Sequence, residues 1–394
     1  MLNQNSKLFM NLKIKDIVKA TKGKLIKGDP ELVIKDISSD SRVVKKGGLF
    51  IALSGKFFKA FPDSRFDGHH FLGSALRKGA IGAIVSKNIK EDFKVIIKVK
   101  DTLGAYHDLA GFWRSKFNIP VVAITGSNGK TTTKDMVTSI LKEKFKVLSS
   151  QESYNNQVGV PITILELEPS HEVLVLELGT NMPGEMKILN SIAKPTIGAI
   201  TNIGPTHLER FKTVGGVKRE KENIFKGVEV KIRGKKSLKP MEQNRDVAIR
   251  IGKALGLSKS MIEKGLKKFK LPKMRMEKIK RNGALIINDA YNANPASMRY
   301  ALNELIKYKG RKIAVLGDML ELGKNSDQFH TDLGKDMPKS IDILITVGKK
   351  AKLMGGDYSY KTTKGAKAKL KGLIESGDTV LLKASRGMKL EKVI

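Results

Sequence analysis

From Val121 onward, short apolar runs alternate with longer stretches whose apolar residues recur at helical spacing, and this alternation is the strongest constraint on the fold. VVAIT (121–125) has the character of a buried strand. KTTTKDMVTSILKEKF (130–145) follows as a helix with Met136, Ile140 and Leu141 on one face. Strands that alternate with helices in this way predict parallel sheets covered by helices, which is an α/β fold.

The same pattern predicts how the chain divides into domains. Residues 172–179 and 196–204 are further buried strands, and a third strand–helix series opens at 284–291. The first hundred residues contain only short β-like runs such as LVIKDIS, GLFIAL, GAIVS and VIIKV. At 394 residues the chain is too long for one ordinary core. We therefore expect three α/β domains, over residues 1–100, 101–272 and 273–394.

Composition excludes several classes of protein. No apolar run approaches the roughly 18 residues that a membrane helix needs, so we expect no membrane insertion. The first sixteen residues lack the continuous apolar stretch of a secretion signal. The absence of Cys excludes disulfides, thiolate metal sites and a Cys nucleophile. A cytoplasmic protein fits these features best, and we expect a monomer.

The charge is unusually basic, with 74 Lys and Arg against 39 Asp and Glu, a net charge of +35. Residues 226–282 hold 19 basic and 5 acidic residues and are the most enriched sector. Three explanations stay open: a Lys-rich composition on solvated faces, attraction of polyanionic small substrates, or nucleic-acid binding. Because the basic residues are spread over the whole chain with few aromatics between them, we favour the first and expect no nucleic-acid partner.

The loop between the strand at 121–125 and the following helix predicts a phosphate site. AITGSNGKTTTK resembles a P-loop, but Ile124 stands where the first glycine of the usual spacing would be. A loop that opens a helix points several backbone N–H groups and the helix N-terminus at one place, which suits an anion. Lys130 then supplies charge to a terminal phosphate, and the Thr131 hydroxyl is placed to bind Mg²⁺.

Two later strands end in side chains that suit the same site. Glu177 lies at the tip of the strand at 172–179, at the sheet edge where α/β proteins bind ligands, so it is a candidate Mg²⁺ ligand beside Thr131. His207 follows the strand at 196–204. A lone His is more often structural than a ligand, although its place after a third strand of one sheet makes ligation plausible.

Together these segments resemble the Mur ligase family, which comprises ATP-dependent amide-forming enzymes of peptidoglycan precursor synthesis. The family form of the phosphate loop is TGSNGKT, as at 125–131, so the short loop is typical of it. The resemblance is greatest to the branch that joins UDP-N-acetylmuramoyl-tripeptide to D-alanyl-D-alanine. The resemblance to the family also rests on six further segments, of which the last three point to this branch: SYNNQVGVP, ELGTNMPGEM, TNIGPTHLERF, DAYNANPASM, GDMLELG and KASRGMKLEK.

The resemblance implies a reaction and a set of residues. A substrate carboxylate attacks the γ-phosphate of ATP, and an amine then displaces phosphate from the acyl phosphate. The implied domains are a UDP-binding N-terminal domain, a central P-loop-type ATPase domain and a Rossmann-like C-terminal domain. Two Mg²⁺ ions are implied, with Thr131, Glu177, His207 and a carbamoylated Lys221 as ligands. The implied catalytic residues are Lys130, His207 and Lys221.

The resemblance also implies which residues contact the two nucleotides. The implied ATP contacts are Gly126, Ser127, Asn128, Gly129, Lys130, Thr131, Thr132, Arg275, Asn292, Asn294 and Asp318. The implied contacts with the UDP-sugar peptide are Ser41, Arg42, Asp67, Gly68, His69, Asn155 and Asn156. On the residues alone, Arg42 suits a diphosphate through its forked donors, and Gly68 allows close backbone approach. For Lys221 the residues alone favour an ion pair with Glu220 or Glu222.

One segment departs from the family pattern. About twenty residues separate Phe225 from Arg245, where members of the family have some fifty or more. We therefore expect strands to be missing from the edge of the central sheet. The alternatives are another amide ligase, such as a folylpolyglutamate synthase, a basic P-loop nucleic-acid ATPase, or a shortened inactive homologue that only binds its ligands.

Overall fold

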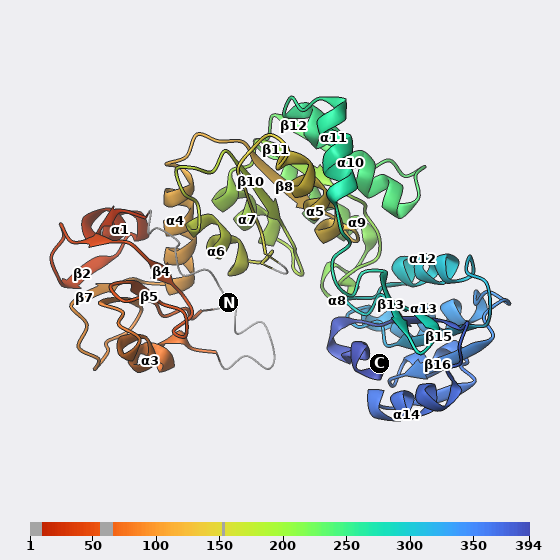
Figure 1. Cartoon of the computed structure of the whole chain (residues 1–394). Coiled ribbons are helices and arrows are strands. Elements are labelled where there is room, and N and C mark those ends of the chain that lie inside the picture. Colours follow the sequence, from red (N-terminus) through yellow and green to blue (C-terminus); the bar gives the residue numbers. More distant parts are fainter. Residues whose placement is uncertain (1–9, 56–65, 152–153) are drawn as a thin grey trace.

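The computed structural model describes residues 10–55, 66–151 and 154–394. Figure 1 shows three sheet-containing bodies in chain order, with the N-terminal body on the left, the central one at the top and the C-terminal one at the lower right. The predicted α/β class is confirmed: within the described residues each body has one large sheet, and a small two-stranded sheet accompanies them. Within the described residues no helix combines the length and the apolar character needed to span a membrane.

The N-terminal body is built on a five-stranded sheet with the order β2-β7-β6-β5-β4. Its strands are β2 (Lys24–Lys27), β4 (Ile37–Ser38), β5 (Leu49–Ile51), β6 (Gly82–Val85) and β7 (Val95–Lys98). All pairs are parallel except β2 with β7. The other elements are β1 (Leu12–Lys13), α1 (Ile14–Thr21), β3 (Val33–Ile34), η1 (Gly68–Phe71) and α3 (Leu72–Arg77). The carboxyl ends of β4, β5 and β6 therefore meet at one edge.

The central body has a wholly parallel sheet with the order β12-β11-β8-β10-β9. Its strands are β8 (Val121–Thr125), β9 (Val147–Ser149), β10 (Val173–Glu177), β11 (Ile197–Ile200) and β12 (Val230–Arg233). Every residue of β8, β10 and β11 is buried, since helices cover both faces of the sheet. The helical elements are α4 (Thr102–Arg114), α5 (Lys130–Leu141), α6 (Gly159–Leu165), α7 (Glu185–Ala193), α8 (Leu208–Phe211), α9 (Val214–Glu222), η2 (Asn223–Phe225), α10 (Pro240–Ala254) and α11 (Lys259–Lys268).

Helix α4 joins the first two bodies. The Asp101 carboxylate caps it by accepting a hydrogen bond from the Leu103 N–H at 3.1 Å. Tyr106 and Leu109 of α4 lie in one continuous apolar cluster with Ile17 of α1 and Leu174 of β10. The predicted boundary near residue 100 thus falls just before a helix that contributes to the cores on both sides of it.

The C-terminal body has a six-stranded sheet with the order β13-β14-β18-β15-β16-β17, in which only β13 is antiparallel to its neighbour. Its strands are β13 (Glu277–Arg281), β14 (Ala284–Asn288), β15 (Lys312–Gly317), β16 (Ile343–Val347), β17 (Tyr358–Tyr360) and β18 (Thr379–Lys383). The helical elements are α12 (Pro295–Leu305), η3 (Gly323–Asn325), α13 (Ser326–Lys335), η4 (Ala351–Met354), α14 (Thr363–Leu373), η5 (Arg386–Met388) and η6 (Leu390–Val393).

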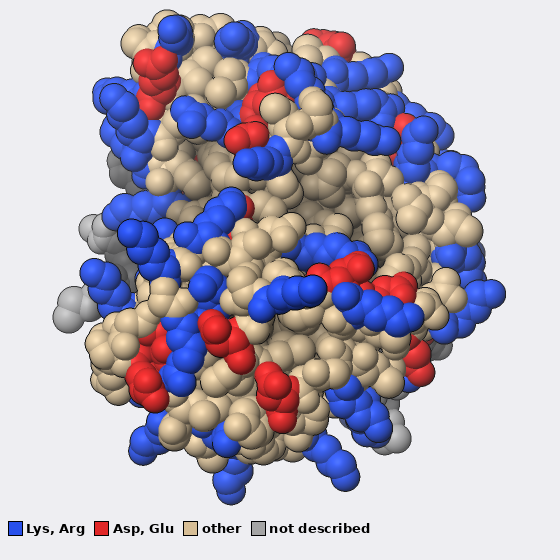
Figure 2. Space-filling view, turned by 90° about the vertical axis from the view of Figure 1, so that its right-hand side faces the viewer, with Lys and Arg blue, Asp and Glu red and all other residues tan. Residues whose placement is uncertain are grey.

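The short segment before α10 leaves a small central sheet. β12 forms its edge, and only residues 234–239 separate β12 from α10. The Lys and Arg side chains are spread over the whole visible face in Figure 2, with Asp and Glu side chains among them, around a hollow between the upper and lower parts. On this face the basic side chains therefore do not form one continuous patch, and the absence of a nucleic-acid partner stays an expectation.

Candidate active site

The shortened phosphate loop packs tightly on the loop that follows β11. A Cβ atom on Gly126 (φ 154°) would lie 1.9 Å from the Thr201 hydroxyl oxygen. The backbone N–H of Ser127 donates to the Asn202 carbonyl at 3.0 Å, and the Asn128 N–H donates to the Asn202 side-chain oxygen at 3.0 Å. Gly129 (φ 78°) is the N-cap residue of α5. The loop needs no earlier glycine at Ile124, because contacts with the neighbouring loop hold it in shape.

A cleft of about 450 Å³ opens between this sheet edge and the C-terminal body. It brings together many of the residues predicted from the sequence. These lining residues are Ser127, Asn128, Gly129, Lys130, Thr131, Thr132, Asn155, Asn156, Glu177, His207, Arg275 and Asn292. They come from six segments that are far apart in the chain. The four segments in the central body lie at or after the carboxyl ends of parallel strands, where α/β sheets bind ligands.

Thr131 and Glu177, predicted as partners in one Mg²⁺ shell, are in direct contact. The Thr131 hydroxyl donates to the Glu177 carboxylate at 2.6 Å, and the Asn155 amide donates to its other oxygen at 2.7 Å. Arg275 donates from Nη2 to the Thr131 hydroxyl oxygen at 2.8 Å. A hydroxyl and a carboxylate are the hard oxygen ligands that Mg²⁺ prefers, so these residues fit the ion. Within the ranges described there is no cluster of three or more His, Cys, Asp or Glu side chains that could hold a metal alone.

Lys130 is less exposed than a residue of a solvent-facing loop would be. It is the first residue of α5, and its ammonium donates to the Gly126 carbonyl at 3.1 Å. Burial lowers the pKa of Lys130; the Glu177 carboxylate opposes this shift and the Arg275 guanidinium adds to it. Two cations thus face one carboxylate in the cleft, an excess of positive charge that suits a polyphosphate.

Lys221 lies on α9 and is 1% exposed. Its pKa is lowered to about 7, mainly by burial and also by the Lys130 ammonium, against the opposing effects of Glu220, Glu177 and Glu185. The ion pairs with Glu220 and Glu222 that the residues alone favour are not formed. Glu220 instead accepts the backbone N–H groups of residues 184 and 186 at 2.8 and 2.7 Å, and Glu222 pairs with Arg233 at 2.9 Å.

His207 stands at the boundary between the central and C-terminal bodies. Its backbone is in the left-handed region (φ 49°), its Nδ1 contacts the Glu321 carboxylate, and its ring meets Phe211 edge-on. Glu321 also has a positive φ, of 62°. Two strained residues that pair across a domain boundary are typical of a functional site.

Of the residues predicted in the C-terminal body, Asn294 reaches the phosphate loop directly. Its side-chain amide donates to the Asn128 side-chain oxygen at 2.7 Å, and its own oxygen caps α12 by accepting from the Ser297 N–H at 2.9 Å. Asp318 stands outside the cleft lining. Its carboxylate accepts three backbone N–H groups of residues 349–351 at 2.7–3.1 Å, so it organises a loop, and a role at the nucleotide stays a prediction.

In the N-terminal body the predicted residues gather at the carboxyl ends of β4 and β5. Ser41 is buried, and the exposed Arg42 forks onto Asp40, with Nη2 at 2.7 Å from the carboxylate. Asp67 accepts from the His69 N–H at 3.0 Å, and the His69 ring accepts from the Ser86 N–H at 3.0 Å. The structure therefore gives His69 a positioning role.

Gly68 lies close to another part of the backbone. A Cβ there would lie 2.6 Å from the Leu53 nitrogen, so packing against the segment after β5 already requires glycine, and a contact of Gly68 with a ligand stays a prediction. Direct contacts of Ser41, Arg42, Asp67 and His69 with a substrate stay predictions.

Sequence reasoning missed several cleft residues. They are Asn244, Asp289, Tyr291, Tyr300 and Lys383. Asp289 and Tyr291 belong to the DAYNANPASM segment, and Lys383 opens KASRGMKLEK, so family resemblance in these two segments is the signal that could find them. Tyr291 stacks beneath the Arg275 guanidinium, 3.9 Å from the ring centre.

The fold and the cleft define a three-domain nucleotide-binding enzyme in which the third domain contacts the phosphate loop of the second. The sequence of residues 124–239 matches the Mur ligase middle domain, and residues 274–386 match the Mur ligase glutamate ligase domain. A UDP-N-acetylmuramoyl-tripeptide–D-alanyl-D-alanine ligase of Bacillus subtilis is 31% identical over 455 aligned positions, which cover 97% of each chain. The chain belongs to the Mur ligase family.

Solved structures agree with this assignment. A crystal structure of MurF from Acinetobacter baumannii superposes with a TM-score of 0.89 at 29% identity, over 98% of each chain. MurF from Thermotoga maritima in complex with ADP gives 0.80 at 27% identity, over 91% of this chain and 96% of that one. The 97% of this 394-residue chain aligned with the B. subtilis relative is about 382 residues, so about 73 of the 455 positions have no residue here. The chain is therefore shorter than that relative.

Proposed function

We propose that the chain is the ATP-dependent ligase that joins D-alanyl-D-alanine to UDP-N-acetylmuramoyl-tripeptide in peptidoglycan precursor synthesis. Full-length relatives that carry this name, including those of Bacillus subtilis and Escherichia coli, support the substrates. The observation that carries the proposal is the contact of Lys130, Thr131, Glu177 and Arg275 in one cleft between two domains. This arrangement binds a nucleoside triphosphate and presents it to a second substrate.

The reaction requires positioning and charge neutralisation more than covalent help from the protein. A carboxylate oxygen of the tripeptide attacks the γ-phosphorus, and ADP leaves. The amine of D-alanyl-D-alanine then attacks the acyl carbon, loses a proton, and inorganic phosphate leaves. Lys130 and Arg275 supply positive charge where the phosphate oxygens lie. Because charge-neutralising groups that are already in place need no reorganisation, they lower the barrier most.

The N-terminal body supports an inference about where the UDP-sugar peptide binds. Arg42 lies within electrostatic reach of Tyr154, the residue before Asn155 and Asn156 in the cleft. We infer that the diphosphate is held near Ser41 and Arg42 and that the peptide runs along residues 154–156 toward Glu177. Asn155 can then donate to the Glu177 carboxylate and also contact the peptide of the UDP-sugar substrate.

Thr131, Glu177, His207 and Lys221 are the residues that would hold two Mg²⁺ ions, which supply charge neutralisation at the phosphates when bound. We infer that Lys221 acts as a carbamate. A buried amine with a pKa near 7 is largely neutral at physiological pH and can add CO₂, whereas an ammonium would repel the cation. The negative carbamate would also attract the Lys130 ammonium, which a protonated Lys221 would repel.

Phosphate release tests the proposal. The assay uses ATP, Mg²⁺ and UDP-N-acetylmuramoyl-tripeptide, with and without D-alanyl-D-alanine, and we expect release to need all of them. D-Glutamate or a diamino acid in place of the dipeptide should give no product. ATP binding without turnover on any of these substrates would favour the shortened inactive homologue, and stimulation by nucleic acid would favour the P-loop ATPase.

A further inference from the structure

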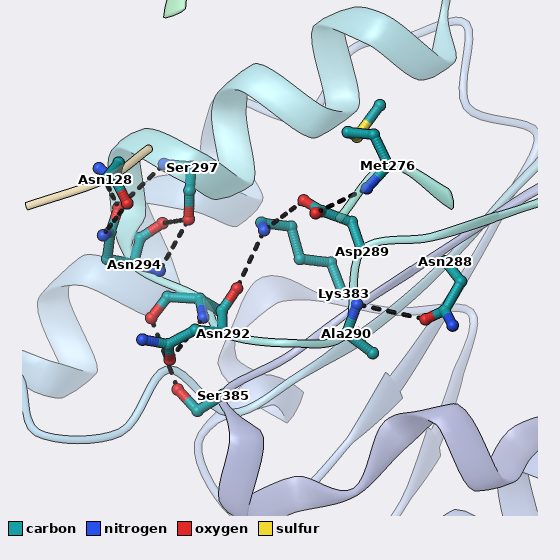
Figure 3. Close-up of polar contacts among 11 residues, drawn as sticks. Asn128, Met276, Asn288, Asp289, Ala290, Asn292, Asn294, Ser297, Lys383 and Ser385 are labelled. Carbon is teal, nitrogen blue, oxygen red and sulfur yellow. Dashed lines mark hydrogen bonds and ion pairs between the residues drawn. The ribbon is translucent and has the colours of Figure 1, made fainter. Parts of the chain in front are cut away.

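Lys383 is a buried lysine to which the reaction above gives no task. It ends β18, its side chain is 3% exposed, and it lines the cleft. Its ammonium lies 2.5 Å from the Asp289 carboxylate and donates to the Asn292 carbonyl at 3.0 Å (Figure 3). The two acceptors belong to a turn after β14, while Lys383 comes from the neighbouring strand.

The contact with Asp289 holds the segment that carries Arg275. The other oxygen of Asp289 accepts from the Met276 N–H at 3.0 Å (Figure 3). Met274 and Met276 have positive φ angles of 56° and 55°, so Arg275 stands between two strained residues. Such backbone persists only where surrounding contacts hold it, and Asp289 provides one of them. Arg275 in turn donates to Thr131 at 2.8 Å.

The contact with Asn292 holds the second segment that reaches the phosphate loop. Two residues further on, Asn294 exchanges side-chain hydrogen bonds with Asn128 at 2.7 and 3.4 Å. Figure 3 shows Asn292 and Asn294 in the same turn, below the start of α12. The backbone carbonyl of Ala293, which lies between Asn292 and Asn294, also accepts from the Ser385 hydroxyl at 3.5 Å. Residues at and just after the end of β18 thus fix this turn.

We propose that Lys383 is a positioning residue that holds both segments of the C-terminal domain, around Arg275 and around Asn294, in register with the phosphate loop. It acts through Asp289 and Asn292, and it sets nucleotide affinity through the placement of Arg275 and Asn294. An ammonium suits this task because its separate donors serve acceptors on different parts of the turn, and a carboxylate this little exposed needs a cation beside it. The proposal rests on the proposed function, because the ligand whose affinity it sets is ATP.

The other end of the same strand provides a matched control. Asp378, directly before β18, is 4% exposed and pairs with Arg311 at 2.8 and 3.0 Å. This pair resembles Lys383–Asp289 in joining a cation to a carboxylate of low exposure, 4% for Asp378 and 14% for Asp289, but it lies at the opposite edge of the sheet from the cleft. Arg311→Met and Lys383→Met therefore each remove the cation of one such pair, the first at the end of β18 away from the cleft and the second at the end beside it.

Calorimetric titration with ADP and Mg²⁺, melting temperature, and the kinetic constants for each substrate test the proposal. We expect both variants to melt earlier than the wild type. Only Lys383→Met should weaken ADP binding and raise the KM for ATP, by about tenfold or more, the amount expected for lost charge-assisted hydrogen bonds. Its KM for the UDP-sugar peptide should stay within about twofold of wild type, since the N-terminal domain is untouched. Lys383→Arg, which keeps the charge, should recover part of the affinity.

Equal ADP affinity in Lys383→Met, Arg311→Met and the wild type would overturn the proposal, as would an equal loss in both variants. If Lys383→Met does not fold, the double variant Asp289→Asn/Lys383→Met, which leaves no unpaired buried charge, replaces it with the same expectation. Failure of the proposed function is a separate result, because it would appear as absent ADP binding or absent phosphate release in the wild type.

Discussion

Lys221 yields a prediction whose size follows from its burial. With a pKa of about 7 in place of 10.5, the neutral fraction of this amine at pH 7.5 rises from about 0.1% to about 75%, roughly a 750-fold gain in the form that reacts with CO₂. We therefore predict that Lys221 carries a carbamate at neutral pH when bicarbonate is present. Removal of bicarbonate and CO₂ should lower the rate of phosphate release, and their return should restore it.

The same shift predicts a pH-dependent stability in the absence of CO₂. Each pKa unit corresponds to about 1.36 kcal/mol, so a shift from 10.5 to about 7 costs the folded state at most about 5 kcal/mol. The unfolded chain binds the proton more tightly, so the cost is complete below pH 7, shrinks as the pH rises from 7 to 10.5, and is absent above 10.5. In CO₂-free buffer, Lys221→Met should thus be more stable than the wild type at pH 7, with the difference narrowing at higher pH.

Carbon-13 NMR with labelled bicarbonate measures the modification directly. We expect a carbamate signal in the wild type that Lys221→Met lacks, and it should strengthen with Mg²⁺ and ATP because bound cation favours the carbamate. Other lysines serve as internal controls, among them Lys134, which is also buried but donates to the Ser150 carbonyl at 2.7 Å. The reasoning is refuted if no carbamate forms in saturating bicarbonate while the enzyme stays fully active.

Three further substitutions test other parts of the site. Lys130→Ala should leave the melting temperature nearly unchanged and lower kcat by about 10²–10³-fold, since one preorganised charge contact is worth roughly 3–4 kcal/mol. Phosphate release within threefold of wild type would contradict the role of Lys130. Arg42→Ala should raise only the KM for the UDP-sugar peptide, because it removes a contact remote from the reacting carboxyl and leaves the Asp40 carboxylate free to repel the diphosphate. Equal changes in the KM of all three substrates would argue against a diphosphate site at Arg42. Gly126→Ala should abolish ADP binding in calorimetry, since its Cβ would lie 1.9 Å from the Thr201 hydroxyl, and normal affinity would show that the loop is free to move.

The sequence predicts best what depends on neighbouring residues. The strand at 121–125, the helix from Lys130 and the later strands appear where periodicity places them, because burial on both faces leaves a local apolar signature. Thr131 and Glu177 also meet as expected, since parallel strands bring their carboxyl ends to one edge.

Contacts between segments that are far apart in the chain could not be predicted from the sequence. Asp318 is a carboxylate at a strand end, as Glu177 is, yet it is bound by the N–H groups of residues 349–351, and no local pattern distinguishes the two. The burial of Lys221 and the pairing of His207 with Glu321 likewise depend on how separate loops and domains pack. Sequence reasoning from the residues alone chose the wrong partner for Lys221 for that reason.

Helix α4, whose apolar residues belong to the cores of both the N-terminal and the central body, determines where this chain can be divided. Because α4 packs against both α1 and the central sheet, a cut near residue 100 would expose apolar surface on both fragments. The C-terminal sheet has apolar clusters of its own, formed by residues from 286 onward. Two polypeptides that meet between α11 and β13 would each retain a complete interior, so the enzyme is suited to expression as two complementing parts. The part that ends at α11 would contain the whole phosphate loop, and the other would contain the contacts that close over it.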